Sequence, residues 1–390
     1  MMNKYNFDLV VDRTNTQSSK WAMLEDKGLI SQVIPCWIAD MEFAMLPELK
    51  QAIIDRLQCP VLGYTDQKIE LKQLICDWYN TRYKYSLTKE QLIITTGVVF
   101  SLVNAINVMT DVDDTIILPT PYYHRFKDSI VNSNRNVLYT KMTINNMRYE
   151  IDYNDLRNKI NSTCKAIIIC NPHNPSGTIY TKKEIDQLVA FCKEYKLKII
   201  SDEIHSDFCF DKNVINIVNY NDYTKENAIS LLSLSKSFNL ASFKVGFSVI
   251  ANEDLRKRFN KLAKHTGITS INTFGLIAIE TCYKYGHRYI DELNDYIYQN
   301  KLYCYNFIKE KMPDILVNIS DGTYLLWLNL TRFSSDDKKL RCELMEIAKI
   351  LPSQGGEFGI DYQGYVRINV ACSRKDVITI MEGLYRYYGR

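Results

Sequence analysis

Hydroxyl and amine side chains gather in the segment SLSKSFNLASFKVGF. Ser233, Ser235 and Lys236 stand at the end of an apolar run at 229–235, and Lys244 follows in the same segment. Hydroxyls and an ammonium group bind phosphate oxygens, while a second amine can form an imine with a carbonyl compound. The segment therefore fits a site for a phosphate and a carbonyl group. A solvated loop rich in lysine and serine would have the same composition.

Acidic residues and a histidine follow another apolar run, in LKIISDEIH. Asp202, Glu203 and His205 come directly after residues 197–201. At the carboxyl end of a strand a carboxylate lies where α/β proteins bind ligands, and it can keep a ring nitrogen protonated. A helix cap or an internally satisfied polar cluster is the structural alternative, and His205 alone also fits a hydrogen-bonded structural histidine.

Three further segments suit a planar, anionic ligand. In NPHNPSG, two Asn-Pro steps hold Asn174 in a rigid loop, from which it can donate to a ring oxygen. Gly97 stands where an apolar run meets a helical pattern, and free N–H groups at a helix start bind anions. Tyr122 and Tyr123, in LPTPYYHRF, offer an aromatic stacking surface. Each segment also has a purely structural interpretation, as a turn, a helix start or rim aromatics.

One arginine stands in an apolar, alternating segment near the end of the chain. Arg367, in GYVRINVAC, would be costly to bury without an anion beside it. A bidentate contact with the α-carboxylate of a substrate is the functional interpretation. An internal salt bridge is the structural one.

The elements that must position these residues alternate between strand and helix. Apolar runs of strand length stand at 92–97, 115–119, 165–170, 197–201, 229–235 and 245–250. Helical patterns at 100–109 and 182–195 lie between them. This alternation predicts an α/β fold with a mostly parallel sheet, whose ligand groups collect at the carboxyl ends of the strands.

The sequence pattern changes near residue 285, where it predicts a long amphipathic helix, a strand at GTYLLWLNL and a last helix. We therefore expect a large domain at 46–284 and a smaller α+β domain at 285–390. The N-terminal segment, 1–45, is expected to pack with the smaller domain.

Composition excludes several classes of function. The 390 residues include 48 Lys and Arg against 45 Asp and Glu, and a net charge of +3 predicts no nucleic-acid partner. No apolar stretch of about 18 to 20 residues or targeting signal is present, so a soluble protein without a membrane partner is expected. Eleven scattered cysteines and five histidines show no ligand spacing, which predicts a cytoplasmic protein without a catalytic metal.

Taken in order along nearly the whole chain, these motifs resemble those of pyridoxal 5'-phosphate (PLP) enzymes of the aspartate aminotransferase fold, fold type I. The resemblance implies that Lys236 forms the Schiff base with PLP, that Asp202 contacts the pyridinium nitrogen and that Asn174 contacts the ring hydroxyl. It further implies that Tyr122 stacks on the ring and that Arg367 binds the substrate carboxylate. The phosphate would be held by Gly97, Val98, Ser233, Ser235 and Lys244.

Two further implications concern the partner and the ring. Enzymes of this fold are usually homodimers, and Tyr64, in LGYTD, resembles the tyrosine that reaches the partner's site. His205 stands where many relatives carry a tyrosine that contacts the ring.

Within this fold the chain resembles the MalY/PatB type of cystathionine β-lyase. The segments that carry this resemblance are DRTNTQSSKW, IPCWIADMEF, NPHNP, DEIH, SKSFNLASFK, GTYLLWL and GGEFG. Ala22 after Trp21 and Leu46 before Pro47 depart from that pattern. The residues expected to set side-chain preference are Ile38, Asp40 and Tyr324.

The activity that this resemblance implies is β-elimination from a small amino acid with a sulfur substituent, giving a thiol, pyruvate and ammonia. An aminotransferase would use the same residues and remains the alternative. A non-catalytic regulatory relative is disfavoured by Lys236. An NAD-dependent dehydrogenase is disfavoured because no G-x-G-x-x-G follows an early strand.

Overall fold

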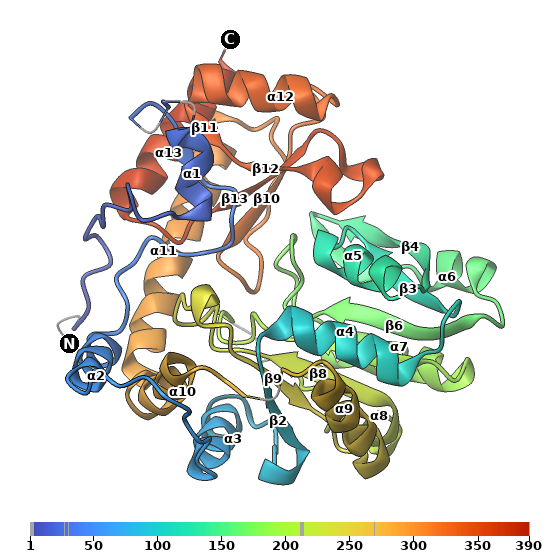
Figure 1. Cartoon of the computed structure of the whole chain (residues 1–390). Helices are drawn as coiled ribbons and strands as arrows, with labels where there is room; N and C mark the ends of the chain where they lie inside the picture. The colour runs from blue at the N-terminus through green and yellow to red at the C-terminus, as the bar shows by residue number, and fades with distance from the viewer. Residues whose placement is uncertain (1–3, 27, 30, 211–213, 269, 390) are drawn as a thin grey trace.

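The computed structural model describes residues 4–26, 28–29, 31–210, 214–268 and 270–389. In this part of the chain the largest sheet has eight strands in the order β2-β9-β8-β7-β6-β3-β4-β5 (Figure 1). Their bounds are β2 Leu92–Thr95, β3 Thr115–Thr120, β4 Asn136–Asn145, β5 Arg148–Ile151, β6 Cys164–Cys170, β7 Lys198–Asp202, β8 Ala228–Leu232 and β9 Gly246–Val249.

The centre of this sheet is parallel. Strands β4, β3, β6, β7 and β8 pair in parallel, whereas β9 runs antiparallel to both of its neighbours and β5 antiparallel to β4. The predicted α/β fold with a mostly parallel sheet is thus confirmed. Parallel pairing brings the carboxyl ends of β6, β7 and β8 to one edge, where the predicted site residues follow.

Helices cover both faces of the large sheet, which explains its continuous apolar strands. In β6, Ile168 packs with helices α4 (Val98–Met109), α5 (His124–Asn132) and α9 (Glu253–His265). Its neighbours Ile167 and Ile169 face the other core, which includes α3 (Glu70–Tyr83), α7 (Lys182–Glu194) and α10 (Thr273–Tyr285). The remaining helices beside this sheet are α2 Pro47–Leu57, α6 Tyr153–Lys159 and α8 Asp222–Asn227.

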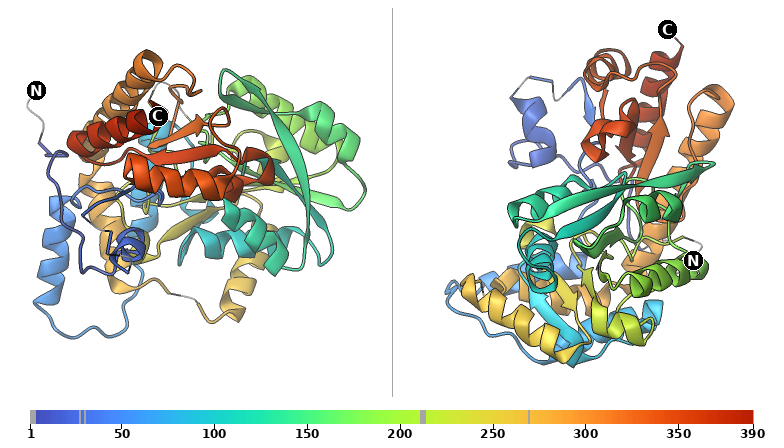
Figure 2. Two further views of the ribbon diagram at one scale, coloured as in Figure 1. Left: turned by 90° about the horizontal axis from the view of Figure 1, so that it is seen from above. Right: turned by 90° about the vertical axis from the view of Figure 1, so that its right-hand side faces the viewer.

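A second core forms around a small antiparallel sheet. Strand β13 (Tyr365–Asn369) lies between β10 (Leu325–Asn329) and β12 (Ser353–Gln354). The helices that pack around it are α12 Asp337–Glu343, α13 Arg374–Tyr388 and the second half of α11 (His287–Lys311), whose first half packs with the core of the large sheet. The right-hand view of Figure 2 shows the strands and the last helices of this second core at one end of the molecule.

The N-terminal segment packs beside this second core. Strand β1 (Ile34–Pro35) pairs in parallel with β11 (Ile350–Leu351), and α1 (Ser19–Glu25) packs on β1. The pairing agrees in direction with the expected contact between the two ends of the chain. The domain bounds themselves stay a prediction.

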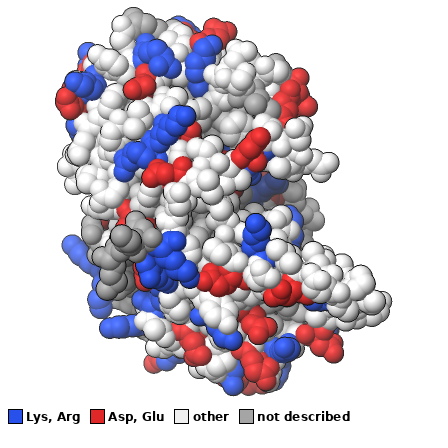
Figure 3. All heavy atoms as spheres, turned by 90° about the vertical axis from the view of Figure 1, so that its left-hand side faces the viewer, with Lys and Arg blue, Asp and Glu red and all other residues white. Residues whose placement is uncertain are grey.

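Charge is mixed on the face shown in Figure 3, where acidic and basic residues alternate without a continuous basic area. None of the helices within the described residues combines the length and apolar character needed to cross a membrane. Nor do the described residues include a group of three or more His, Cys, Asp or Glu side chains placed to hold a metal ion.

Candidate active site

The ends of the central strands open into a cavity of about 680 Å³. Its wall combines the strand-end loops of the large sheet with residues of the N-terminal segment and of β12 and β13. Of the residues named from the sequence, those that line it are Ile38, Gly97, Val98, Tyr123, Asn174, Asp202, His205, Ser235, Lys236, Lys244 and Arg367. Segments far apart in the sequence therefore converge on one space.

Lys236 follows β8 and projects into this cavity. Its Nζ donates a hydrogen bond to the main-chain oxygen of Ala39 at 2.6 Å. Burial, helped by the positive charge of Arg367, lowers the pKa of Lys236 from 10.5 to about 8. A substantial fraction of this amine is therefore neutral, and nucleophilic, near physiological pH.

Asp202 is the last residue of β7 and is buried. One carboxylate oxygen accepts a hydrogen bond from the N–H of Ile204 at 3.1 Å. Burial raises the pKa of Asp202 to about 6, and the positive charge of Lys236 partly opposes that rise. Such a carboxylate gains from a cationic partner inside the cavity.

Arg367 and Asn174 are joined across the cavity wall. The Arg367 guanidinium donates to Asn174 Oδ1 at 2.8 Å and to the main-chain oxygen of Trp37 at 2.6 Å. The first contact fixes the amide of Asn174 and leaves its NH₂ group to donate. Arg367 Nε is buried and has no hydrogen-bond partner within the described residues, and burial lowers the Arg367 pKa to about 10. Among the described residues Arg367 forms no ion pair at 4.0 Å or less, although Glu357 is the leading favourable charge around it.

His205 is buried, and its Nδ1 has no hydrogen-bond partner in the part of the chain that the structure describes. Its ring meets the Tyr324 ring edge to face, with centroids 5.9 Å apart. Burial lowers the pKa of His205 well below its usual value, so the ring is neutral. A neutral imidazole at the wall can contact a planar ligand without adding charge.

Main-chain N–H groups and hydroxyls form a cradle at the start of α4. Gly97 precedes this helix with φ +110°, and the helix N-terminus opens into the cavity. A Cβ on Gly246 of β9 would lie 2.7 Å from the Gly97 carbonyl carbon, so glycine is needed for this close approach. Ser235 and Lys244 complete the cradle. The arrangement suits a phosphate.

Ser233 supports this cradle from behind instead of lining it. It is buried, donates from Oγ to the Val245 oxygen at 2.6 Å and accepts from the Ser235 N–H at 2.9 Å. The expected phosphate contact of Ser233 is thus not present in the cavity wall. The serine fixes the loop that carries Ser235.

Tyr122 also differs from its expected place. It is absent from the cavity wall, where Tyr123 stands instead. The Tyr122 ring stacks on Tyr139 at 5.5 Å, and its N–H donates to the Phe358 oxygen at 2.9 Å. Tyr123 has extended backbone angles, and successive side chains of extended backbone point to opposite sides. Two adjacent tyrosines therefore cannot both face the cavity.

Asp40 and Tyr64 lie outside the cavity wall of this chain. Asp40 forms ion pairs with Arg13 at 2.9 Å and Lys20 at 3.1 Å, while its neighbours Ile38 and Ala39 line the cavity. Asp40 therefore joins parts of the N-terminal segment, and its expected substrate contact stays a prediction. Tyr64 is fully exposed on the loop between α2 and α3.

Other wall residues had no signal strong enough to single them out in the sequence. They include Trp37, His124, Arg125, Ser353, Glu357 and Phe358. GGEFG, which contains two of them, contributed to the family resemblance, but nothing in it indicated a contact with Arg367. The Arg367 guanidinium lies over the Phe358 ring, 4.9 Å from its centroid, because residues 355–358 pack against β13.

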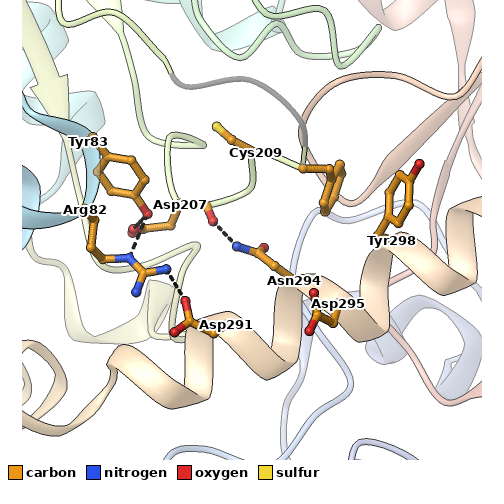
Figure 4. A pocket seen from close by; sticks show the side chains of 9 residues that line it. Arg82, Tyr83, Asp207, Cys209, Asp291, Asn294, Asp295 and Tyr298 are labelled. Atoms are coloured by element: carbon orange, nitrogen blue, oxygen red, sulfur yellow. Dashed lines mark hydrogen bonds and ion pairs between the residues drawn. The ribbon is translucent and has the colours of Figure 1, made fainter.

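A second hollow, of about 420 Å³, lies between α3 and α11 (Figure 4). Two of its charged groups, Arg82 and Asp291, form an ion pair at 2.7 Å, and Asp207 accepts a hydrogen bond from Trp78 Nε1 at 3.0 Å. Asp207 also binds the hydroxyl of Ser237, the residue after Lys236. Asp207 therefore supports the Lys236 loop from the side of this hollow.

Comparisons with known proteins agree with this geometry. The sequence profile of the family described as aminotransferase class I and II matches residues 38–384. The chain is 28% identical to the cystathionine beta-lyase PatB of Bacillus subtilis (strain 168) over 383 residues, 98% of each chain.

Two solved structures with bound PLP share the fold. Cystalysin from Treponema denticola has a TM-score of 0.94 and 29% identity, with 98% of each chain covered. The C-S lyase from Staphylococcus hominis has a TM-score of 0.89 and 27% identity, covering 99% of this chain and 98% of that one.

Proposed function

The chain belongs to the family of class I and class II aminotransferases, and from this premise we propose that it acts on sulfur-containing amino acids. It is a PLP-dependent carbon–sulfur lyase of the cystathionine β-lyase type. It converts an amino acid with a sulfur substituent on Cβ into a thiol, pyruvate and ammonia. Its substrates are cystathionine and cysteine conjugates.

The residues of the cavity fit PLP. A phosphate matches the N–H groups before α4 together with Ser235 and Lys244. The buried Lys236 amine, in its neutral form, can react with the PLP aldehyde. The flat, neutral side chain of His205 can contact the pyridine ring, since its Nδ1 has no hydrogen-bond partner within the described residues. We assign these residues to PLP on the chemistry of the donor set.

Bound PLP supplies an electron sink for the negative charge that develops on the substrate Cα. Lys236, in its neutral form, takes the proton from Cα, a role for which its lowered pKa suits it. Asp202, buried at the end of β7, holds the proton on the ring nitrogen by ion pairing. Asn174 donates from its fixed amide to the ring hydroxyl.

Arg367 binds the substrate α-carboxylate. Its guanidinium is already oriented by Asn174 and Trp37, and its Nε has no other partner within the described residues. A preformed guanidinium of this kind loses little entropy when it binds a carboxylate. Tyr123, and not Tyr122, stacks on the cofactor ring in this proposal, since Tyr123 lines the cavity.

One observation carries the proposal: Lys236, Asp202 and Arg367 converge in a single cavity of a chain that matches a cystathionine beta-lyase over nearly its whole length. An aminotransferase would need the same three residues. The reaction products therefore distinguish a lyase from an aminotransferase.

The test is to incubate the purified holoenzyme with L-cystathionine and no 2-oxo acid, and to measure pyruvate and free thiol together. Elimination predicts equal amounts of the two, formed over many turnovers. Transfer of the amino group would produce no pyruvate and would stop after one turnover until a 2-oxo acid is added, which would contradict the proposal.

The assembly and the setting belong to the same proposal. We propose a homodimer in which the exposed Tyr64 reaches the partner's cofactor site. The domain division at 1–45, 46–284 and 285–390 is proposed with it. Eleven free cysteines support a reducing, cytoplasmic compartment.

A further inference from the structure

One cation of the cavity wall has no role in the proposed reaction. Lys236, Lys244 and Arg367 are assigned to the aldehyde, the phosphate and the α-carboxylate. Arg125, in the first turn of α5, also lines the cavity and has no such assignment. Arg125 is therefore placed to bind an anion other than the PLP phosphate and the α-carboxylate of the substrate.

Arg125 and Arg367 border the same part of the cavity. Burial raises the pKa of Tyr123, and the guanidinium groups of Arg125 and Arg367 both oppose that rise. Burial lowers the pKa of His124, and the same two guanidinium groups lower it further. Arg125 and Arg367 also line the same cavity, together with Tyr123 and His124, so a substrate that binds Arg367 and extends along this wall approaches Arg125.

The Arg125 guanidinium has two internal partners among the described residues, the Tyr123 hydroxyl, where its hydrogen bond opposes the rise that burial causes in the pKa, and the Asp128 carboxylate. Its ion pair with Asp128 is 3.9 Å long, and the two side chains are 55% and 47% exposed. By comparison, Arg148 and Glu184 pair at 2.7 Å with less exposed side chains. A long, exposed pair holds its members weakly, so Arg125 can turn to a ligand.

His124 adds a neutral donor beside this cation. Its ring lies edge to face against Tyr123, with centroids 4.6 Å apart, and within the described residues it makes no hydrogen bond or ion pair. A guanidinium and an imidazole together suit a carboxylate, which accepts several hydrogen bonds.

Two acidic residues line the cavity, Asp202, which is assigned to the ring nitrogen, and Glu357. Glu357 stands on η4 (Gly355–Phe358), which is joined to the tyrosine segment by the bond from Tyr122 N to the Phe358 oxygen, 2.9 Å. One Glu357 oxygen accepts from the Gln354 N–H at 3.3 Å, and among the charges around Arg367 it is the leading favourable one. Glu357 therefore interacts with the backbone of η4 and with Arg367, and Arg125 stays available to bind the ligand.

We propose that Arg125, aided by His124, determines specificity by binding a carboxylate at the far end of the substrate's sulfur substituent. The inference rests on the proposed lyase function and adds its substrate class: β-thio amino acids whose sulfur substituent ends in a carboxylate. Arg367 is buried, whereas His124 and Arg125 are exposed at the wall. A substituent that runs outward from the buried end passes these two residues.

Three substrates of one shape test this. S-(2-carboxyethyl)-L-cysteine carries the carboxylate, S-(2-carbamoylethyl)-L-cysteine is its neutral amide, and S-(2-aminoethyl)-L-cysteine carries the opposite charge. The readout is kcat/KM for pyruvate release by the holoenzyme. We expect the wild-type enzyme to prefer the acid to the amide by about tenfold or more, as a charge-assisted contact predicts.

The variants are Arg125→Gln and Arg125→Glu, with Lys127→Gln as the matched control. Lys127 is exposed on the same helix and does not line the cavity. We expect Arg125→Gln to abolish the preference for the acid with little change on the amide. Arg125→Glu should shift the preference towards the aminoethyl substrate, while Lys127→Gln keeps the wild-type ratio.

An acid-to-amide ratio that is the same in wild type and Arg125→Gln, or that Lys127→Gln lowers equally, would overturn the inference. Failure of the proposed function is a separate result: no pyruvate from any of the three substrates. Pyruvate from the amide at an unaltered rate shows that the lyase is intact, so that any change in the ratio reports on Arg125 alone.

Discussion

Lys236 and Ala39 are joined by a hydrogen bond of 2.6 Å from the lysine Nζ to the alanine main-chain oxygen. Lys236 follows β8 of the large sheet, whereas Ala39 belongs to the N-terminal segment whose strand β1 pairs with β11. Tyr324 donates to the same oxygen at 2.9 Å. The position of the reactive amine therefore depends on the packing of the two ends of the chain against the large sheet.

The lowered pKa of Lys236 predicts how the enzyme takes up its cofactor. Only the neutral amine reacts with an aldehyde, so the rate of PLP uptake by the apoenzyme should rise with pH and level off above about 8. Stopped-flow absorbance between pH 6.5 and 10 measures this. In Arg367→Gln the plateau should move to higher pH, because a positive neighbour is lost. A wild-type rate still rising at pH 10 would contradict the assigned pKa.

Replacing the adjacent buried carboxylates Asp202 and Glu203 should have different effects, the first on kcat/KM and the second on the free energy of unfolding. Asp202→Asn should keep the fold and bind PLP but lower kcat/KM by about 10²- to 10³-fold, because the ring nitrogen loses its ion pair. Glu203 instead accepts hydrogen bonds from Ser230 at 2.7 Å and Asn216 at 2.9 Å. Glu203→Gln should cost about 1–3 kcal/mol of unfolding free energy and leave kcat/KM of the folded enzyme near wild type. Urea unfolding and steady-state kinetics on both variants check this, and a reversed pattern would refute the assignment.

The two adjacent tyrosines give a similar contrast. Tyr123→Ala should weaken PLP binding by about 3- to 10-fold, because a stacking partner is removed. Tyr122→Ala should instead lower stability by about 3 kcal/mol, since the buried ring packs on Tyr139. Fluorescence titration of the apoenzymes with PLP, beside thermal unfolding, distinguishes them. Weaker cofactor binding in Tyr122→Ala alone would restore the original expectation from the sequence.

Mixing two defective chains tests the proposed role of Tyr64. Tyr64→Ala and Lys236→Ala should each be strongly impaired as homodimers. When they are unfolded together and refolded, a mixed dimer should regain one site that combines Lys236 from one chain with Tyr64 from its partner. Pyruvate formation should then reach about a quarter of the wild-type rate, given random pairing and one site of two per mixed dimer. No recovery in a sample shown to be dimeric would contradict a shared site.

The central fold was predictable because its strands are apolar on both faces. The runs at 165–170 and 197–201 match β6 (Cys164–Cys170) and β7 (Lys198–Asp202) to within a residue. Strands β4 and β5 have no such signal, because β5 is the edge strand, β4 is next to it, and both expose much of their surface. Without an unbroken apolar run, such strands leave little trace in one sequence.

The site was predictable where a side chain directly follows a central strand. Asp202 and Lys236 were singled out for that reason, and both line the cavity. Side-chain direction and distant packing were not predictable. The choice between Tyr122 and Tyr123 depends on the local backbone, and the contacts of Ala39 and Arg125 depend on elements brought together only by folding.

The most direct test of the account is to locate the cofactor on the chain. The holoenzyme is reduced with borohydride, which makes a lysine–cofactor bond permanent, and is then digested and analysed by mass spectrometry. The account predicts one modified peptide, carrying the added mass on Lys236, and no modification in Lys236→Ala, although the variant still folds. The added mass on another lysine, or an unmodified wild-type chain that nonetheless forms pyruvate, would contradict it.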